Sequence, residues 1–267
     1  MSNLKIARLS VAAVVSVFVI ATVPNLFAQF QPPGSLGALA PANIAKPRPK
    51  PPFDLTGTWL HGGGGADNGF RFAPPTDFKL TPEAQVHYDA ARKAQAEGKV
   101  YRDDIGQCWP SGLPILMTRV WPIAMIQLPT AIFMIQELMN TMRIIYLDGR
   151  SHTDPDIAVR SFNGESIGRW ENDALVVDTT NFVADHHWID SGIPASDALH
   201  IVERIRMINE GKTLEIQFTA SDPKSWEGEW KWTKRWQRVD ERDIAEVECL
   251  PELNEHMPTT HSNANVR

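Results

Sequence analysis

Apolar and polar residues alternate in short runs along most of the chain, and this period of two is typical of strands with one buried face. Residues 53–60 form the first run, which ends at the glycines 62–65. Gly, Asp and Asn turns separate the later runs, with no helical pattern between them, so we predict an antiparallel sheet. Those later runs occupy residues 123–127, 130–138, 143–148, 157–162, 166–171, 174–179, 199–208, 213–220, 229–238 and 243–249.

A sheet of about eight to ten strands has edges that could pair with other chains, and closure into a barrel or packing into a tight sandwich hides them. The sequence therefore predicts a mainly β fold, an antiparallel barrel over residues 53–250 with one N-terminal helix. The helix has Thr81 as N-cap, begins at Pro82 and ends at Gly98. Its apolar face has little bulk, so we expect it to lie on the surface.

The first 28 residues have the pattern of a secretory signal peptide. Lys5 and Arg8 precede a 15-residue apolar run, residues 9–23. That run is shorter than the roughly 20 residues that span a bilayer, although an uncleaved anchor is the alternative. Ala28 offers a cleavage site. We expect a periplasmic or secreted protein with no membrane span after signal cleavage.

Two further segments are expected to lie outside the packed domain. Residues 29–52 contain seven prolines and predict a Pro-rich linker or disordered leader. Residues 251–267 are polar and predict a flexible tail. Residues 53–250 remain as a single domain that is large enough for a sizeable core.

Charge and cysteine content narrow the partners and the compartment. The net charge is −6, and no basic run follows the signal segment, which argues against nucleic acid and anionic membranes as partners. Cys108 and Cys249 form an even pair. In an oxidising compartment they could form a disulfide, and two isolated buried thiols are the alternative.

Three ionisable residues fall on the apolar face of their strands, where a charge must be paired or have a shifted pKa. They are Glu137, Arg143 and Glu203. Arg143 could pair with either glutamate. A catalytic pair and a structural ion pair that fixes strand register are both open at this point.

The residues around Asp148-Gly149, which we interpret as a hairpin turn, supply further candidates. His152 follows this turn and Tyr146 precedes it. A histidine near carboxylates titrates near neutrality and can act as acid or base, although a solvated surface histidine is the alternative. Asn172-Asp173 predicts a second hairpin turn.

Aromatic residues and one further histidine are candidates for ligand binding. Trp230, Trp232 and Trp236 share one face of their strand, as core residues or as a ligand platform. Trp170 and His200 are further candidates.

Known cofactor and metal motifs are absent from the sequence. His186 and His187 lie near Asp185 and Asp190, but adjacent histidines do not readily face one ion. Residues 164–168 spell G-x-S-x-G, but a strand rather than a helix follows, unlike a nucleophile elbow. We expect no metal and no cofactor.

Six ordered segments together resemble a large uncharacterised family of exported bacterial proteins. The resemblance covers nearly the whole domain. It implies a lipocalin-like (calycin-type) β-barrel and export, and it implies no particular reaction. The segments are DLTGTW (54–59), CWPSGLP (108–114), RIIYLDGRSH (143–152), GESIGRWENDALVVDT (164–179), SDALHIVER (196–204) and DPKSW (222–226).

These observations favour a cofactor-independent acid–base enzyme, a lyase or isomerase that acts on a small hydrophobic molecule inside the barrel. His152 or Glu203 would be the base, and Tyr146 or Glu137 the acid. Arg143 would stabilise developing negative charge. The alternatives are a periplasmic carrier of a small ligand and, on the leader alone, an envelope-associated interaction protein. The sequence does not specify the oligomeric state.

Overall fold

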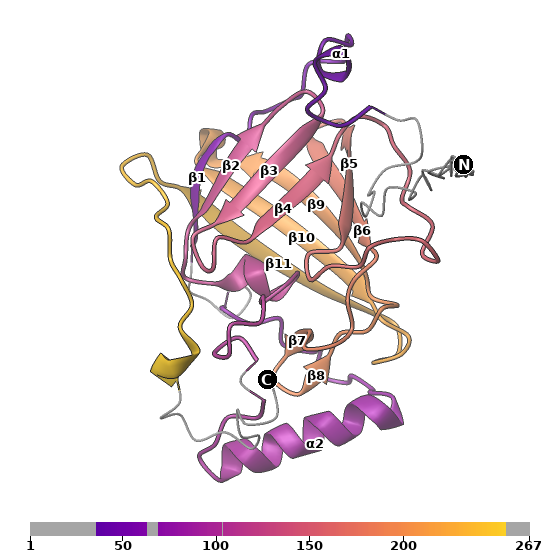
Figure 1. Ribbon diagram of the computed structural model, residues 1–267, viewed down its shortest axis with the longest axis vertical. Coiled ribbons are helices and arrows are strands. Elements are labelled where there is room, and N and C mark those ends of the chain that lie inside the picture. Colours follow the sequence, from indigo (N-terminus) through magenta and orange to yellow (C-terminus); the bar gives the residue numbers. More distant parts are fainter. Residues whose placement is uncertain (1–35, 63–68, 103, 255–267) are drawn as a thin grey trace, which may run out of the picture.

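The computed structural model describes residues 36–62, 69–102 and 104–254, and its main feature is a closed barrel of nine strands (Figure 1). Around the barrel the order is β1-β11-β10-β9-β6-β5-β4-β3-β2, and β1 pairs with β2 to close it. The predicted mainly β, lipocalin-like barrel class is confirmed. The strands are β1 (Gly57–His61), β2 (Ile123–Gln127), β3 (Ala131–Gln136), β4 (Met142–Tyr146), β5 (Glu165–Glu171), β6 (Ala174–Thr180), β9 (His200–Ile208), β10 (Thr213–Ser221) and β11 (Glu229–Arg238).

One pair of neighbours departs from the predicted antiparallel pattern, because β4 and β5 run parallel. Parallel neighbours need a connection that crosses from one end of the sheet to the other. Asp148-Gly149 therefore opens a crossover loop, residues 147–164, and its interpretation as a hairpin turn is wrong. The second predicted turn, at Asn172, does join the antiparallel pair β5 and β6.

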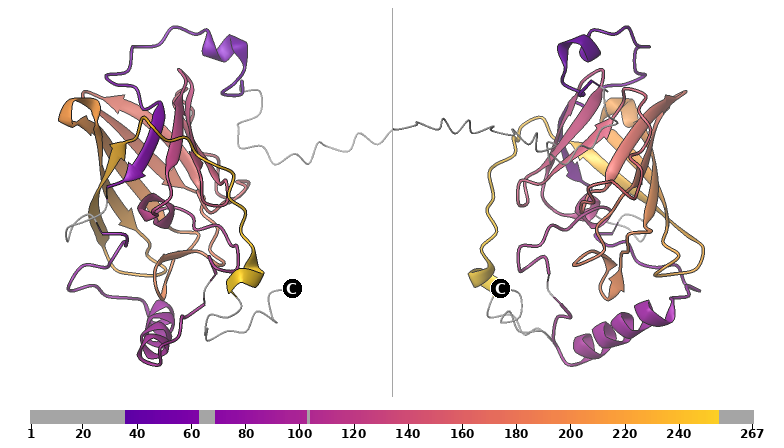
Figure 2. Two further views of the ribbon diagram at one scale, coloured as in Figure 1. Left: turned by 90° about the vertical axis from the view of Figure 1, so that its left-hand side faces the viewer. Right: turned by 45° about the vertical axis from the view of Figure 1, so that its right-hand side comes forward.

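Two predicted strands are absent. Residues 157–162 belong to the crossover loop, where Ser161 makes only an isolated bridge to Phe182. Residues 243–249 run along the outside of the barrel, with an isolated bridge from Val247 to Leu138 (Figure 2). Neither segment adds a strand to the barrel, whose β1–β2 contact already closes the sheet.

Two helices lie at opposite ends of the barrel, α1 (Pro41–Ile44) at one and α2 (Pro82–Ala96) at the other (Figures 1 and 2). Thr81 caps α2 as predicted, since its hydroxyl accepts a hydrogen bond from the Ala84 amide at 3.3 Å. The predicted helix is confirmed. Between α2 and the barrel lies a small hairpin, and three 3₁₀ turns complete the chain. These elements are β7 (Trp188–Asp190), β8 (Ile193–Pro194), η1 (Ile115–Thr118), η2 (Asn209–Gly211) and η3 (Pro251–Asn254).

The N-terminal strap, residues 36–54, lies against the α1 end of the barrel, where the sequence predicts a linker. Asn43 is buried and donates to Asp148 at 3.0 Å, and the Thr130 hydroxyl donates to the Ala38 carbonyl at 2.6 Å. Polar side chains thus anchor a segment whose composition alone suggests disorder. The expected signal peptide, residues 1–28, lies outside the described residues. Of the predicted tail, residues 251–267, the first four form a 3₁₀ turn and residues 255–267 lie outside the described residues.

Large apolar side chains fill the barrel interior. Trp230 and Trp236 point inward and are buried, Trp232 packs against them, and Trp226 stacks on Trp230 at 4.4 Å between ring centroids. These tryptophans are core residues in the structure. A disulfide joins Cys108 to Cys249. In the part of the chain that the structure covers, no helix has the length and apolar character needed to cross a membrane.

Candidate functional site

Inside the barrel, an ion pair between Arg143 on β4 and Glu203 on β9 is the centre of a polar network. One guanidinium nitrogen of Arg143 donates to Glu203 at 3.0 Å, and a second pairs with the other carboxylate oxygen. The remaining donors reach Ser166 on β5 at 3.0 Å and Thr179 on β6 at 3.2 Å. The network therefore ties together four neighbouring strands, β4, β5, β6 and β9.

This interior pair is almost completely buried. Glu203 is 0% exposed and Arg143 is 2% exposed. Both carboxylate oxygens are bonded to the guanidinium, and buried apolar side chains such as Ile145 and Leu175 surround the barrel axis. The geometry fits an ion pair that sets the register of the four strands, and it leaves Glu203 no route to a substrate.

On the outer face of the same four strands, a second polar cluster lies at the end of the wall where β5 and β9 begin. Tyr146 on β4 lies opposite Ile167 on β5, which lies opposite Asp178 on β6. Glu165 begins β5 and His200 begins β9, also on the outer face. The crossover loop packs against this wall, and His152 of the loop contacts Glu165 and Asp178.

Hydrogen bonds join two imidazoles and two carboxylates in an unbroken chain, which we call the outer cluster: Glu165, His152, Asp178 and His200. His152 Nδ1 lies 3.2 Å from Glu165 Oε2, and its Nε2 lies 2.9 Å from Asp178 Oδ1. The other oxygen of Asp178 lies 3.1 Å from His200 Nε2. The chain runs from a buried carboxylate, Glu165, to a partly exposed imidazole, His200.

The close contacts shift the proton affinities within the outer cluster. Burial alone would lower the pKa of His152, but its hydrogen bonds to Asp178 and Glu165 outweigh burial and raise that pKa to about 9. The hydrogen bonds from His152 and His200 hold the pKa of Asp178 well below its usual range. The hydrogen bond to Asp178 raises the pKa of His200. At neutral pH His152 is therefore an imidazolium between two carboxylates.

Glu165 is the structural member of the outer cluster. Burial would raise its pKa, but hydrogen bonds from His152, Thr153 and Asn181 lower it. Thr153 donates through both its amide, at 2.8 Å, and its hydroxyl, at 2.7 Å. Asn181 donates at 3.0 Å. Glu165 thus holds the crossover loop on the barrel wall.

His200 is the member with an open nitrogen. Its side chain is 42% exposed, and its Nε2 faces Asp178. Its Nδ1 makes no hydrogen bond with any residue that the structure describes. An imidazole held by a carboxylate on one side and open on the other has the arrangement of a general acid or base.

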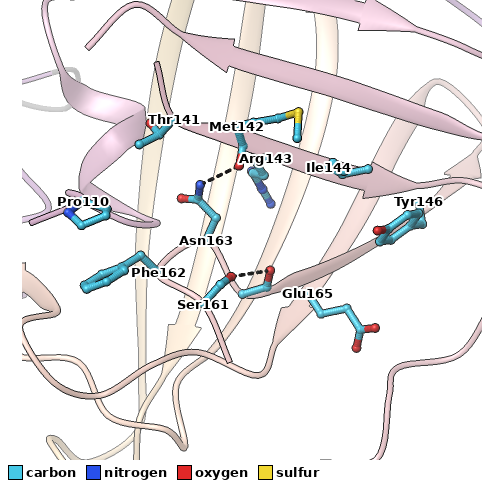
Figure 3. A pocket seen from close by; sticks show the side chains of 11 residues that line it. Pro110, Thr141, Met142, Arg143, Ile144, Tyr146, Ser161, Phe162, Asn163 and Glu165 are labelled. Carbon is cyan, nitrogen blue, oxygen red and sulfur yellow. Dashed lines mark hydrogen bonds between the residues drawn. The ribbon is translucent and has the colours of Figure 1, made fainter. Parts of the chain in front are cut away.

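A cleft of about 350 Å³ borders the cluster on the β4 side (Figure 3). It extends from Pro110 and Phe162 at one end to Tyr146 at the other, with Arg143 and Glu165 along its wall. Burial raises the pKa of Tyr146, so its hydroxyl keeps its proton at neutral pH. Arg150 stacks over the Tyr146 ring at 3.8 Å and bonds Asp148.

The structure brings together His152, Tyr146 and His200 on the outside of the wall, and Arg143 with Glu203 on the inside. Glu137 joins neither group, because its carboxylate pairs with Arg242 at 2.9 Å and accepts from the Ala245 amide. Trp170 lies at the α1 end of the barrel, beside Phe53. The predicted catalytic residues thus divide into two separate clusters.

Sequence reasoning missed Glu165 and Asp178 as site residues. Period-two alternation does place both on the outer face, beside Ile167. What the pattern lacks is the pairing of β6 with β9, which are not consecutive in the sequence and which bring Asp178 to His200. Across the residues that the structure describes, no group of three or more His, Cys, Asp or Glu side chains could hold a metal ion.

Comparisons with known proteins add no assignment. No protein-family model matches the chain, and a search of curated proteins finds no match. The site must therefore be interpreted from its own geometry.

Proposed function

We propose that the protein is an exported acid–base enzyme of the lyase or isomerase type, which acts on a small, largely apolar molecule without a cofactor. The observation that carries the proposal is the outer cluster, a continuous His–carboxylate chain that ends at an open imidazole nitrogen on His200 and whose other end, Glu165, lines a cleft. Ionisable groups with strongly shifted pKa values in such a setting are typical of active sites. The outer wall replaces the barrel interior as the expected site.

His200 is the proton-transfer group in this proposal. Its Nδ1 accepts a proton from a carbon next to a carbonyl group, while Nε2 stays bonded to Asp178 and keeps the ring oriented. Solvent water returns the proton to the substrate oxygen, because Tyr146 on β4 lies three strand spacings of about 4.8 Å from β9, too far for one carbonyl group to contact both residues. Tyr146 lines the neighbouring cleft and contacts the apolar part of the molecule.

His152 supplies a fixed positive charge. Both of its ring nitrogens are bonded to carboxylates, so it does not itself contact the substrate. Its imidazolium balances Asp178 and Glu165, and it stabilises negative charge that develops on an enolate-like intermediate. His152 is therefore a positioning residue.

Export is part of the proposal and rests on two observations. The first is the apolar N-terminal run with its small cleavage residue, Ala28. The second is the disulfide between Cys108 and Cys249, since such bonds persist in oxidising compartments such as the periplasm or the cell exterior.

A non-catalytic carrier of a small ligand is the second candidate. The cavity beneath the N-terminal strap favours it, and in that case the outer cluster acts only as a clip for the crossover loop. The two candidates differ in whether His200 Nδ1 exchanges protons with a bound molecule.

Deuterium exchange in D₂O tests the proposal whatever the final product of the reaction is. A panel of terpenoid, steroid and phenolic ketones is incubated with the protein, and incorporation of deuterium next to the carbonyl is followed by NMR. His200→Gln should lower the exchange rate by about 10²–10⁴-fold with little change in melting temperature. Arg204→Gln, on the same face of β9 and in a surface ion pair with Glu171, is the matched control. Equal rates in the two variants, or no exchange with any ketone of the panel, would contradict the enzyme.

A further inference from the structure

A cavity of about 1040 Å³ lies at the α1 end of the barrel, between the N-terminal strap and the ends of the strands. Small-molecule sites have volumes of about 300–1,000 Å³ and occur at the mouths of barrels. The cavity is distinct from the outer cluster and contains none of its four members. Its walls are the strap from Ile44 to Asp54, the β2–β3 turn, the end of β4 and the end of β5.

The strap is anchored on both sides of this cavity. On one side, Asn43 donates to Asp148, and its side chain is buried. On the other, the Leu55 amide donates to Gln127 at 3.0 Å, and Gln127 donates back to the Phe53 carbonyl. Between the anchors, residues 47–52 include four prolines, which favour an extended and stiff backbone. The strap therefore crosses the cavity as an ordered, extended segment.

The floor of the cavity is apolar. Trp170 projects from β5 and packs edge to face against Phe53 of the strap, with 5.0 Å between ring centroids. Leu128 and Leu147 complete this surface. Neither Trp170 nor Phe53 is fully buried, so both rings keep area for contact with a ligand.

The rim of the cavity is positively charged. Lys46, Arg48 and Lys50 of the strap line it. Arg169 of β5 also lines it, but it pairs with Glu171 at 2.6 Å. The two carboxylates of the lining are engaged, Asp148 with Arg150 and Asp54 with the Thr56 amide. The lining thus has an excess of cationic groups.

Arg48 is the most informative of these cations. It is partly buried, and its guanidinium donates only to neutral acceptors, the Asn43 carbonyl and side-chain oxygen at 2.7 Å and the Lys46 carbonyl at 3.2 Å. Within residues 36–62, 69–102 and 104–254, no carboxylate pairs with it. A guanidinium fixed by neutral groups next to a cavity is arranged for an anion from outside the chain.

We infer that this cavity binds an amphipathic anion, a molecule with a flat apolar body and one carboxylate or sulfonate group. The apolar body packs on Trp170 and Phe53, and the anionic group meets Arg48 with Lys46 and Lys50 beside it. Apolar burial supplies most of the affinity and the cations select the charge. The inference does not depend on the proposed function.

Two dyes with the same ring system test the inference directly. 1-Anilinonaphthalene-8-sulfonate has the anionic group, and N-phenyl-1-naphthylamine lacks it. Fluorescence titration of the purified protein should show one site that binds the sulfonate at least tenfold more tightly than the neutral dye. Added salt should weaken the sulfonate alone, because only its binding includes a charge pair.

Variants locate the site. Arg48→Gln should weaken the sulfonate about tenfold and leave the neutral dye unchanged, and Trp170→Leu should weaken both dyes. The matched controls are Lys79→Gln, a cation at the α2 end, and Trp232→Leu, a tryptophan far from the strap; both should bind as the unmodified protein does. His200→Gln should also bind normally, which separates this result from the proposed enzyme activity.

The inference is overturned by equal affinity for the two dyes, by no measurable binding of the sulfonate, or by a loss of binding in Trp232→Leu but not in Trp170→Leu. Circular dichroism melting checks the fold of each variant. If Arg48→Gln fails to fold, the inference is tested in the unmodified protein alone, by the ratio of the two dye affinities and by how that ratio changes with salt.

Discussion

The two faces of one barrel wall, formed by β4, β5, β6 and β9, carry polar clusters that differ in composition and in exposure to solvent. On the inner face, Arg143 and Glu203 are sealed among apolar side chains, with both carboxylate oxygens bonded to the guanidinium. On the outer face, His152 and Asp178 are partly exposed, and the chain of hydrogen bonds ends at the open nitrogen of His200.

The difference shows that burial and residue type act together: a buried arginine–carboxylate pair keeps its protons, whereas partly exposed histidines have an ordinary pKa near neutral pH. Glu203 is fully buried and bonded at both oxygens, so the pair contributes to the register and stability of the wall. In our proposal, the outer cluster exchanges protons with a bound molecule. Substitution of Glu203 on the inner face should therefore lower mainly the stability, and substitution of His200 on the outer face should lower mainly the rate of deuterium exchange.

The largest loss of stability is expected from Glu203→Gln. The substitution removes the negative partner of Arg143 and leaves a buried cation without compensation, which typically costs about 3–5 kcal/mol. Urea denaturation measures the change in the free energy of unfolding. The double variant Arg143→Met with Glu203→Leu should recover most of that loss, because no buried charge remains. A loss below about 1 kcal/mol in the single variant would contradict the structural role.

A smaller loss is expected from Glu165→Gln on the outer face. Glu165 accepts hydrogen bonds from His152, Thr153 and Asn181, and the amide cannot satisfy all of those donors. We expect a loss of about 1–3 kcal/mol. Hydrogen exchange should show faster exchange of the Thr153 amide, because the crossover loop is released. Unchanged protection of that amide would show that Glu165 does not hold the loop.

A pH-dependent change of stability is expected from His152. Its pKa is raised from 6.5 to about 9 in the folded protein, so its contribution is fully present below about pH 6.5 and is lost as the pH rises through 9. The change should be on the order of 1 kcal/mol, because the ring is partly exposed to solvent. Urea midpoints measured across this range should fall, and His152→Gln should remove the fall. If the urea midpoint fell equally with pH in the unmodified protein and in His152→Gln, the pH dependence would come from other groups.

The smallest change of stability is expected from His200→Gln. Its contact with Asp178 lies at the surface, where such pairs contribute about 0–1 kcal/mol. The same variant should show the largest loss of deuterium exchange. A large fall in melting temperature would place His200 with the structural residues of the inner face.

Much of the barrel could be predicted from sequence, because strand alternation and helix-end signals depend only on residues that are close together in the chain. Period-two alternation places Arg143 and Glu203 on the inner face, and the helix signals place α2. The crossover could not be predicted in this way, because the Asp148-Gly149 turn has the same local signal whether the next strand returns parallel or antiparallel.

The candidate site was harder to predict, because its members meet only through non-consecutive strands. Asp178 reaches His200 because β6 pairs with β9, and His152 reaches both carboxylates because the loop folds back over the wall. The order of the N-terminal strap was also not predicted, because its proline-rich composition is typical of a disordered linker. Its order depends on single buried contacts such as Asn43 to Asp148, which composition does not reveal.

The outer cluster is, in our proposal, a coupled proton-exchanging centre, and the titration of its histidines tests this most directly. NMR of ¹⁵N-labelled imidazoles from about pH 4 to about 10 gives the pKa of each ring in the unmodified protein and in Asp178→Asn. We predict that His152 titrates near 9 and His200 above 6.5, and that both values fall together when Asp178 loses its charge. Two histidines that titrate independently near 6.5, unaffected by Asp178→Asn, would contradict this coupling.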